Sequence, residues 1–423
     1  MDCRPAFLAL LLAACGGEPS DSATSSLPFE LPAGYRRLAE PLFAPVRAAL
    51  EVGDGERALA LLERVQGFEA GLLRVRGLFL TGDTVSALAE LEEAKRLAPD
   101  SPEAAAVEIE LLATLDRLQG AAEILERAMK QDGRHPALLR AQGVVELRNP
   151  GHGRQALAAL ERARALDPEL PFLRYPLAQA QVLAGRGELE QAPAEALAKA
   201  RAAAALWPGL LEALELEAEA QVGLLDFGAA LTLYGELERR GQDHQSLRAT
   251  LEQRWSTLCL LQRDRAAAVE HALSARKLGL SEAELGYGAE LLREAASEAL
   301  ARGRSAAEAK DWPAAEAEFA RAHELAPRDL EAENHLAVAR FQRGDYRAAA
   351  EAWSSVWSSA RRTGVALPDP VPLNLAKAWR LAGERKLARS TLDELLDGDP
   401  EGPWSREARE LLFQLEVEEL APK

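Results

Sequence analysis

The sequence predicts an all-α fold of repeated helix pairs, an α-solenoid. Three observations predict it: many alanines, a small residue that recurs at a regular interval, and glycines and prolines that interrupt the helical pattern at similar points of each repeat. Hydrophobic residues make up 48% of the 423 residues and aromatic residues only 5%. This composition suits closely packed helices, because alanine is the best helix former and its side chain is small, and it argues against general disorder.

The charge of the chain restricts its partners. Asp and Glu number 67 against 50 Lys and Arg, which gives a net charge of −17. Nucleic acid and anionic membrane surfaces attract proteins that carry a surplus of cations. We therefore expect no nucleic acid as the main partner.

Residues 1–14 predict a signal peptide. Arg4 precedes an unbroken apolar run over residues 6–14, which has the length of a signal-peptide apolar region and is far shorter than the roughly 20 residues that span a bilayer. Residues 12–15 read Leu-Ala-Ala-Cys and resemble the lipobox of bacterial lipoproteins. The resemblance implies cleavage before Cys15 and lipid attachment to it. The alternatives are an ordinary secretory signal or a chance cysteine.

Residues 15–30 then predict a lipidated cysteine and a flexible tether, because residues 16–26 are small and polar. Several acyl chains on one residue would anchor the chain stably. Gly16 is not the aspartate that is linked with inner-membrane retention in some bacteria. We expect a lipid-anchored protein of the bacterial cell envelope, in the periplasm or at the outer membrane, with a membrane contact through its lipid.

The three cysteines exclude a disulfide framework. Cys3 would leave with the signal peptide, and Cys15 would carry lipid. Only Cys259 remains, within an apolar run, and we expect it to be buried and inert.

The repeats are visible as columns of residues. A small residue stands near the start of the second helix of each expected pair, and three of the intervals between these residues are 34 residues. This column is Ala58, Ala87, Ala121, Ala156, Ala196, Ala230, Ala268, Ala315, Ala349 and Ala388. Four residues later, on the same helix face, stand Leu62, Leu91, Leu125, Leu160, Ala200, Tyr234, Ala272, Phe319, Trp353 and Leu392. In five repeats a proline follows twelve residues after the alanine, where it ends the helix pair.

A period of 34 with small-residue, aromatic and proline columns resembles the tetratricopeptide repeat (TPR). Two repeats match best. The first is residues 299–327, with Gly303, Trp312, Ala315, Phe319 and Pro327, and the second is the repeat that follows it, with Tyr346, Ala349 and Trp353. The resemblance implies about ten stacked helix pairs whose first helices line a concave groove, where peptide ligands usually lie.

Within this array we expect TPR-like repeats over residues 31–240, a divergent repeat with an extra helix over 241–298, C-terminal repeats over 299–403 and a capping helix over 404–423. Ser405 is the expected N-cap of that last helix. Insertions lengthen the pattern at residues 185–193, 279–302 and 359–370, and they are either binding segments or tolerated loops.

No motif predicts catalysis. The sequence contains no His-Glu-x-x-His, Cys-x-x-Cys or phosphate-loop pattern, and its six histidines are scattered. We expect no enzyme activity, catalytic residue, metal or cofactor.

Helix periodicity places six polar or basic residues on or near the concave face of the three best-matched repeats. They are Arg304, Asn334, Gln342, Asn374, Lys377 and Arg380. Such residues in an acidic protein could hold a carboxylate or a peptide backbone. The alternative is a solvated face without a ligand.

The sequence thus favours a non-enzymatic scaffold or adaptor lipoprotein that binds a protein or peptide in the groove of its solenoid. The alternatives are an accessory subunit or enzyme that acts on an envelope polymer, and a self-assembling structural protein. The sequence predicts no particular oligomeric state.

Overall fold

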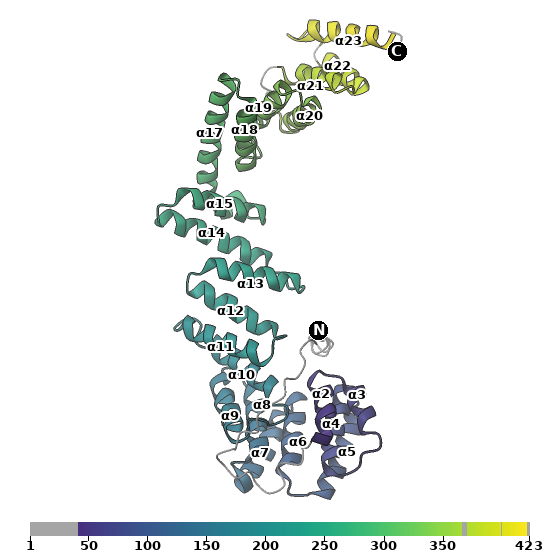
Figure 1. Ribbon diagram of the computed structural model, residues 1–423, viewed down its shortest axis with the longest axis vertical. Helices are drawn as coiled ribbons and strands as arrows, with labels where there is room; N and C mark the ends of the chain where they lie inside the picture. Colours follow the sequence, from purple (N-terminus) through teal and green to yellow (C-terminus); the bar gives the residue numbers. More distant parts are fainter. Residues whose placement is uncertain (1–40, 366–369, 399, 421–423) are drawn as a thin grey trace. The chain divides into compact units, whose positions relative to one another are not determined.

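The computed structural model describes residues 41–365, 370–398 and 400–420 (Figure 1). The predicted signal peptide, the tether and Cys15 lie outside these residues. The described residues form helices joined by short turns and contain no strand. None of these helices combines the length and the apolar character needed to cross a bilayer. The chain divides into two compact units, Met1–His244 (unit 1) and Gln245–Lys423 (unit 2), and each is a stack of helix pairs.

The described part of unit 1 contains a short 3-10 helix and six helix pairs. They are η3 (Pro41–Phe43), α2 (Ala44–Glu51) with α3 (Gly55–Leu62), α4 (Phe68–Leu80) with α5 (Thr84–Leu97), α6 (Pro102–Thr114) with α7 (Leu118–Asp132), α8 (Pro136–Leu147) with α9 (Gly153–Leu166), α10 (Arg174–Arg186) with α11 (Pro193–Leu206), and α12 (Leu211–Gly223) with α13 (Phe227–Arg239).

The described part of unit 2 contains four helix pairs, one short helix and a last helix. They are α14 (Gln245–Leu261) with α15 (Arg265–Lys277), α16 (Glu282–Leu285), α17 (Tyr287–Glu308) with α18 (Trp312–Leu325), α19 (Leu330–Gln342) with α20 (Tyr346–Thr363), α21 (Val371–Leu381) with α22 (Arg385–Gly398), and α23 (Ser405–Leu420). The expected all-α solenoid of about ten pairs is confirmed.

The alanine column is the innermost layer of each pair. All ten alanines have no exposed surface. In the second column Leu125 is half-buried, and the other nine residues are buried. An alanine allows the two helix axes to approach closely, and the larger residue one turn later fills the space that remains. The two columns that recur in the sequence therefore form the core of the helix pairs, as predicted.

The turn inside many pairs has a recurrent local structure. A residue with positive φ is followed by an aspartate whose carboxylate accepts a hydrogen bond from the third residue of the next helix. Asp83 accepts from the Ser86 N–H at 3.0 Å, after Gly82 with φ 85°. At the equivalent turn before Asp226, Leu225 adopts φ 62° without being glycine. This turn ends the first helix and aims the second back along it.

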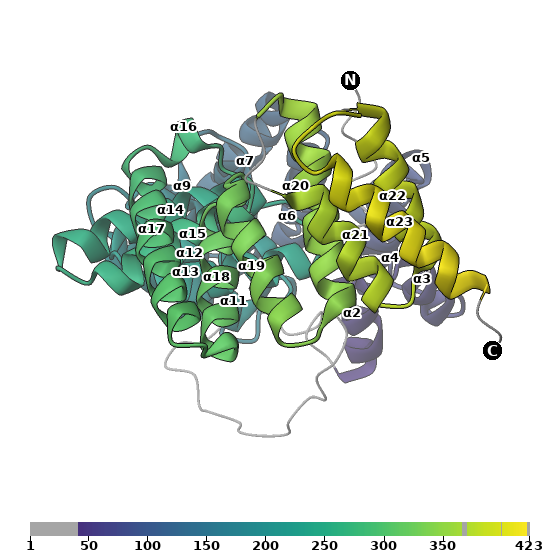
Figure 2. The same ribbon diagram turned by 90° about the horizontal axis from the view of Figure 1, so that it is seen from above.

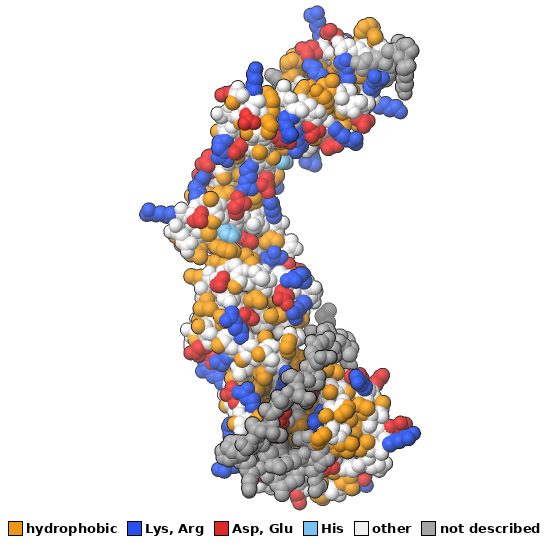
Figure 3. Space-filling view, in the orientation of Figure 1, with side chains coloured by type: hydrophobic (Ala, Val, Ile, Leu, Met, Phe, Trp, Pro, Cys, Tyr) orange, Lys and Arg blue, Asp and Glu red, His pale blue; other side chains and the backbone are white. Residues whose placement is uncertain are grey.

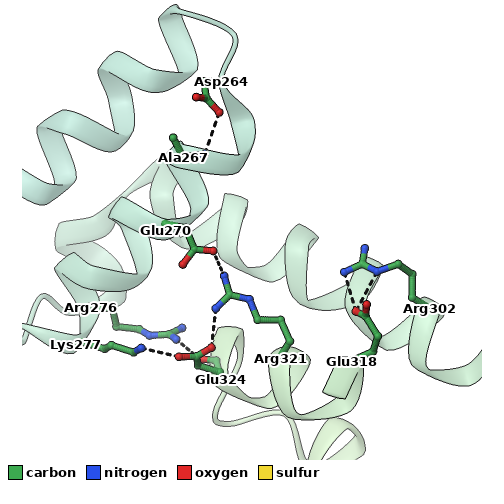
Figure 4. Close-up of polar contacts among 9 residues, drawn as sticks. All are labelled: Asp264, Ala267, Glu270, Arg276, Lys277, Arg302, Glu318, Arg321 and Glu324. Carbon is green, nitrogen blue, oxygen red and sulfur yellow. Dashed lines mark hydrogen bonds and ion pairs between the residues drawn. The ribbon is translucent and has the colours of Figure 1, made fainter. Parts of the chain in front are cut away.

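In unit 2, polar contacts join α15 to α18 (Figure 4). The Arg276 guanidinium donates to the Leu325 carbonyl oxygen at 2.7 Å, at the C-terminal end of α18, where a cation is favourable. Glu324 accepts from Lys277 and from Arg321, both at 2.6 Å. The 22-residue α17 packs against both α15 and α18, so the lengthened segment that interrupts the repeat period remains part of the stack.

The insertion at residues 185–193 is also attached to the core. Glu188 in this connection is buried, and its carboxylate pairs with Lys199 at 2.6 Å and with Arg154 at 3.4 Å. These pairs join the connection to α11 and α9.

The last helix differs from the expectation at its first residue. α23 begins at Ser405, so Ser405 is its first helical residue and not its N-cap. Ala408, Leu411 and Leu415 are buried against α21 and α22. Figure 2 draws these helices from above. On the outer face of this helix Phe413 is 65% exposed.

We predict that Ala349→Trp destabilises unit 2. Ala349 is fully buried beside Ala337 and Trp353, and an indole there overpacks the pair at a cost of roughly 1–3 kcal/mol or more. Thermal unfolding followed by circular dichroism measures the effect. The control is Ser355→Trp, at an exposed position of the same helix. Equal melting of both variants and the wild type would contradict the core that the columns define.

Candidate functional site

The six residues predicted to bind in the groove all lie on first helices of unit 2. Arg304 is on α17, Asn334 and Gln342 are on α19, and Asn374, Lys377 and Arg380 are on α21. Arg304, Lys377 and Arg380 have exposed or half-buried side chains. The Arg304 side chain reaches the next first helix, α19, and those of Lys377 and Arg380 reach the last helix, α23.

Most of these six side chains already have partners in the protein. Arg304 pairs with Glu331, and Lys377 pairs with Glu407 at 3.6 Å. Basic and acidic side chains also lie close together over the face of unit 2 that Figure 3 draws. The predicted residues are thus brought to one row of helices, but there their charges are largely matched by neighbouring helices.

Arg380 and Asn334, two others of the six predicted residues, also contact side chains of the protein itself. Arg380 donates to the side-chain oxygen of Gln414 at 2.6 Å. The Asn334 side-chain oxygen accepts from the Trp353 indole at 2.8 Å, which fixes a core tryptophan.

Cys259 lies in a core cluster of unit 2 and is 5% exposed. Burial raises the pKa of its thiol, and this disfavours a reactive thiolate. In the described ranges, no three His, Cys, Asp or Glu side chains gather as metal ligands would.

Unit 1 contains a cavity of about 410 Å³, which we call the N-terminal cavity. Its walls come from the first helices of all six pairs and from the connections before α10 and α12. The lining residues include Leu50, Glu51, Arg76, Leu80, Glu110, Thr114, Val144, Leu147, Arg148, Phe172, Tyr175, Gln179, Val182, Arg186, Trp207 and Glu212. The cavity thus lies on the face of the solenoid where the repeat resemblance places ligands.

Three charged residues on α4, α6 and α8 form a network beside this cavity. The two carboxylate oxygens of Glu110 accept from Arg140 Nε at 2.6 Å and from Arg76 Nη2. Burial alone would raise the pKa of Glu110, but the positive charges of Arg140 and Arg76 outweigh it and lower the pKa. Glu110 is therefore held as an anion, which makes it a poor proton donor.

The connection that ends at α10 is part of the same network. Arg140 also donates to the Pro171 carbonyl oxygen at 2.5 Å. The next residue, Phe172, has φ 62°, a conformation that is rare for a bulky side chain. Its ring lies 4.4 Å from the Arg76 guanidinium carbon, so it makes a cation–π contact inside the cavity.

Aromatic side chains form another wall. The Tyr175 and Trp207 rings meet edge to face, with centroids 5.2 Å apart. The Tyr175 hydroxyl accepts from Gln179 Nε2 at 3.0 Å. Arg186 pairs with Glu215 at 3.1 Å. Much of the wall is therefore apolar, and several of its polar groups are satisfied within the protein.

Sequence reasoning did not select these residues. One signal was present: Arg76 and Glu110 are 34 residues apart, which is the repeat period, so they occupy the same position in consecutive first helices. A charged residue at a position that faces the stack is unusual. Phe172 and Pro171 gave no such signal, because they belong to an irregular connection.

We predict that Glu110→Gln destabilises unit 1 by roughly 3–5 kcal/mol, because it leaves two enclosed arginines without an anion. Differential scanning calorimetry measures the shift in Tm. The control is Glu331→Gln, which removes the half-exposed partner of Arg304 and is expected to change stability by less than about 1 kcal/mol. If Glu110→Gln melts like the wild type, the network does not hold the first helices together.

No protein-family model matches the chain, and no curated protein matches it. Among solved structures, the chain is similar to the TPR2AB domain of yeast Sti1 in its pHSP90 complex, at 17% identity over 57% of this chain and 98% of that chain, with a TM-score of 0.27. It is similar to a human IFIT1 dimer with PPP-AAAA at 16% identity, over 74% and 73% of the two chains, with a TM-score of 0.35. A tetratricopeptide repeat protein from Parabacteroides merdae is 12% identical over 60% of this chain and 98% of that chain, with a TM-score of 0.30. The assignment of TPR-like pairs depends on the stacked helices and columns of the chain itself.

Proposed function

We propose that this chain is a non-enzymatic scaffold that binds a segment of a protein partner in the N-terminal cavity. The observation that carries the proposal is a cavity of about 410 Å³ lined by first helices of six consecutive pairs. Its volume falls within the range of sites that enclose small groups. A peptide side chain that enters it loses contact with water on several sides, and this is the setting in which single anchor residues dominate binding.

The lining supports a peptide partner over a small polar metabolite. Phe172, Tyr175 and Trp207 are rigid aromatic groups that offer large contact areas. Glu110, whose two oxygens are both occupied by arginines, is not available as a general acid or base. The site therefore suits recognition better than proton transfer.

The proposal moves the binding site from unit 2 to unit 1. Arg304 and Lys377 of unit 2 already pair with neighbouring carboxylates. A ligand there would compete with these pairs, although exposed pairs are weak. A ligand in the N-terminal cavity does not have to displace these two ion pairs.

We further propose that the scaffold acts at a bacterial cell envelope, held there by lipid on Cys15. The support is the sequence Leu-Ala-Ala-Cys at residues 12–15, after an apolar run and before a polar tether. Such an anchor would keep the cavity close to partners of the envelope.

We predict that Thr114→Trp blocks peptide binding. Thr114 is exposed, lines the cavity and uses its hydroxyl only toward the backbone of Glu110, so an indole there fills the cavity without disturbing the core. Peptides are selected from a random displayed library on the wild type, and their Kd is then measured for each variant. We expect Thr114→Trp to weaken binding at least roughly tenfold.

The matched control is Gln342→Trp, at an exposed position of the row predicted in unit 2. Peptides that lose affinity only for Gln342→Trp would place the site in unit 2. Failure to select any peptide on the wild type would contradict the scaffold proposal.

We predict that Cys15→Ser releases the protein from the membrane fraction, because no lipid can then be attached. The measurement is fractionation of bacterial cells that express each form, combined with metabolic labelling by a fatty acid. Membrane retention of the variant, or an unlabelled wild type, would defeat the lipoprotein proposal.

A further inference from the structure

The Arg76–Glu110–Arg140 network contains more positive than negative charge. Two guanidinium groups share one carboxylate, and both oxygens of that carboxylate are occupied. Arginine keeps its charge in proteins. One positive charge in the network therefore has no counter-ion within it, although the chain as a whole carries −17.

The unbalanced charge is accessible at Arg76. The Arg140 side chain is 6% exposed, and it uses Nε for Glu110 and Nη1 for the Pro171 carbonyl. The Arg76 side chain is 21% exposed and borders the N-terminal cavity and two smaller cavities beside it. Among the described residues, only Glu110 accepts a hydrogen bond from Arg76, and it does so from Nη2. The N–H groups of Nε and Nη1 can therefore donate to a ligand.

Apolar groups lie on one side of this cation. Leu50, Leu80 and Phe172 line the N-terminal cavity together with Arg76, and all four also line the smaller cavity of about 150 Å³. The strained backbone of Phe172 keeps its ring against the guanidinium. A cation with spare donors thus lies at one end of an apolar space.

We propose that the N-terminal cavity binds a single carboxylate carried beside a bulky apolar group. The carboxylate lies on Arg76, where the guanidinium fork matches its two oxygens. The apolar group lies along Phe172, Leu50 and Leu80. This inference rests on the proposed function for its site and adds the chemistry of the ligand.

The cavity wall carries further charges of both signs: the acidic residues Glu51 and Glu212, and the basic residues Arg148, Arg174 and Arg186. The network itself lacks one negative charge, which a carboxylate supplies.

The test uses a dansyl-labelled fatty acid and its uncharged primary amide, below their micelle concentrations, with dansyl fluorescence as the readout of binding to the full chain. We expect the acid to bind the wild type roughly tenfold more tightly than the amide, the scale of one charge-assisted hydrogen-bond pair. Arg76→Met should abolish this preference while still binding the amide. Its fold should persist, because Glu110 and Arg140 remain as a balanced pair.

Two further variants control for folding. Arg76→Lys keeps the charge and should retain part of the preference. Arg304→Met removes an arginine from a row of unit 2 and should retain all of it. A preference that survives in Arg76→Met would overturn the proposal, and so would a wild type that shows no acid preference and whose selected peptides tolerate the loss of every carboxylate.

A second arm separates a free amphiphile from a group on a peptide. In each selected peptide, every Asp, Glu and C-terminal carboxylate is replaced in turn by its amide. If amidation of one carboxylate lowers the affinity of a peptide tenfold for the wild type but not for Arg76→Met, the bound carboxylate belongs to a peptide. If amidation leaves the affinity of every peptide unchanged while the probe still prefers its acid form, the ligand is a free amphiphile. Peptides that bind in the cavity without any carboxylate, together with a probe that shows no acid preference, would leave the scaffold function intact and overturn this inference alone.

Discussion

The structure depends on the close contact between the two helices of each pair, which is made at the alanine column. Each of these ten alanines is fully buried, and a larger side chain there would separate the helices. The same restriction acts on the facing helix: a Cβ added to Gly303 would lie 2.5 Å from the Phe319 ring. Because pairs stack only when this contact is tight, it fixes the positions of the first helices, and the first helices carry the cavity.

The periodic part of this architecture is readable from sequence for a physical reason. Helix pairs repeat the same local contacts, so one residue type recurs at one register, and the columns at Ala315 and Phe319 report burial directly. The turn residues act over three positions, as Asp83 and Ser86 do. The residue columns and the turn residues both depend on contacts between residues close in the sequence, so they can be recognised in a single sequence.

The site is less readable, because its parts come from three consecutive repeats and an irregular connection, and most of their positions do not recur. Arg140 and Glu110 are 30 residues apart, and Arg140 reaches Pro171 over 31 residues. No helical period links these positions, and the conformation of Phe172 follows from packing of the connection and not from its own preference. In unit 2 the periodic position of a residue was readable, and its partner was not. Periodicity put Arg304 on a first helix, but it could not show that Glu331 lies beside it.

The two units use one fold for two different inner surfaces, and the difference lies in how charges are matched. In unit 2 an exposed cation such as Arg304 meets a carboxylate of the next first helix, so the row needs no ligand to balance it. In unit 1 two arginines meet one enclosed carboxylate, and the electrostatic cost of the unmatched charge is higher there because less water screens it. An apolar residue in place of Arg76 would leave Glu110 and Arg140 as a balanced pair and would avoid this cost. An enclosed, unbalanced cation beside an apolar cavity is therefore better explained by recognition than by folding, since the fold is held by the columns and function resides in the site built upon it.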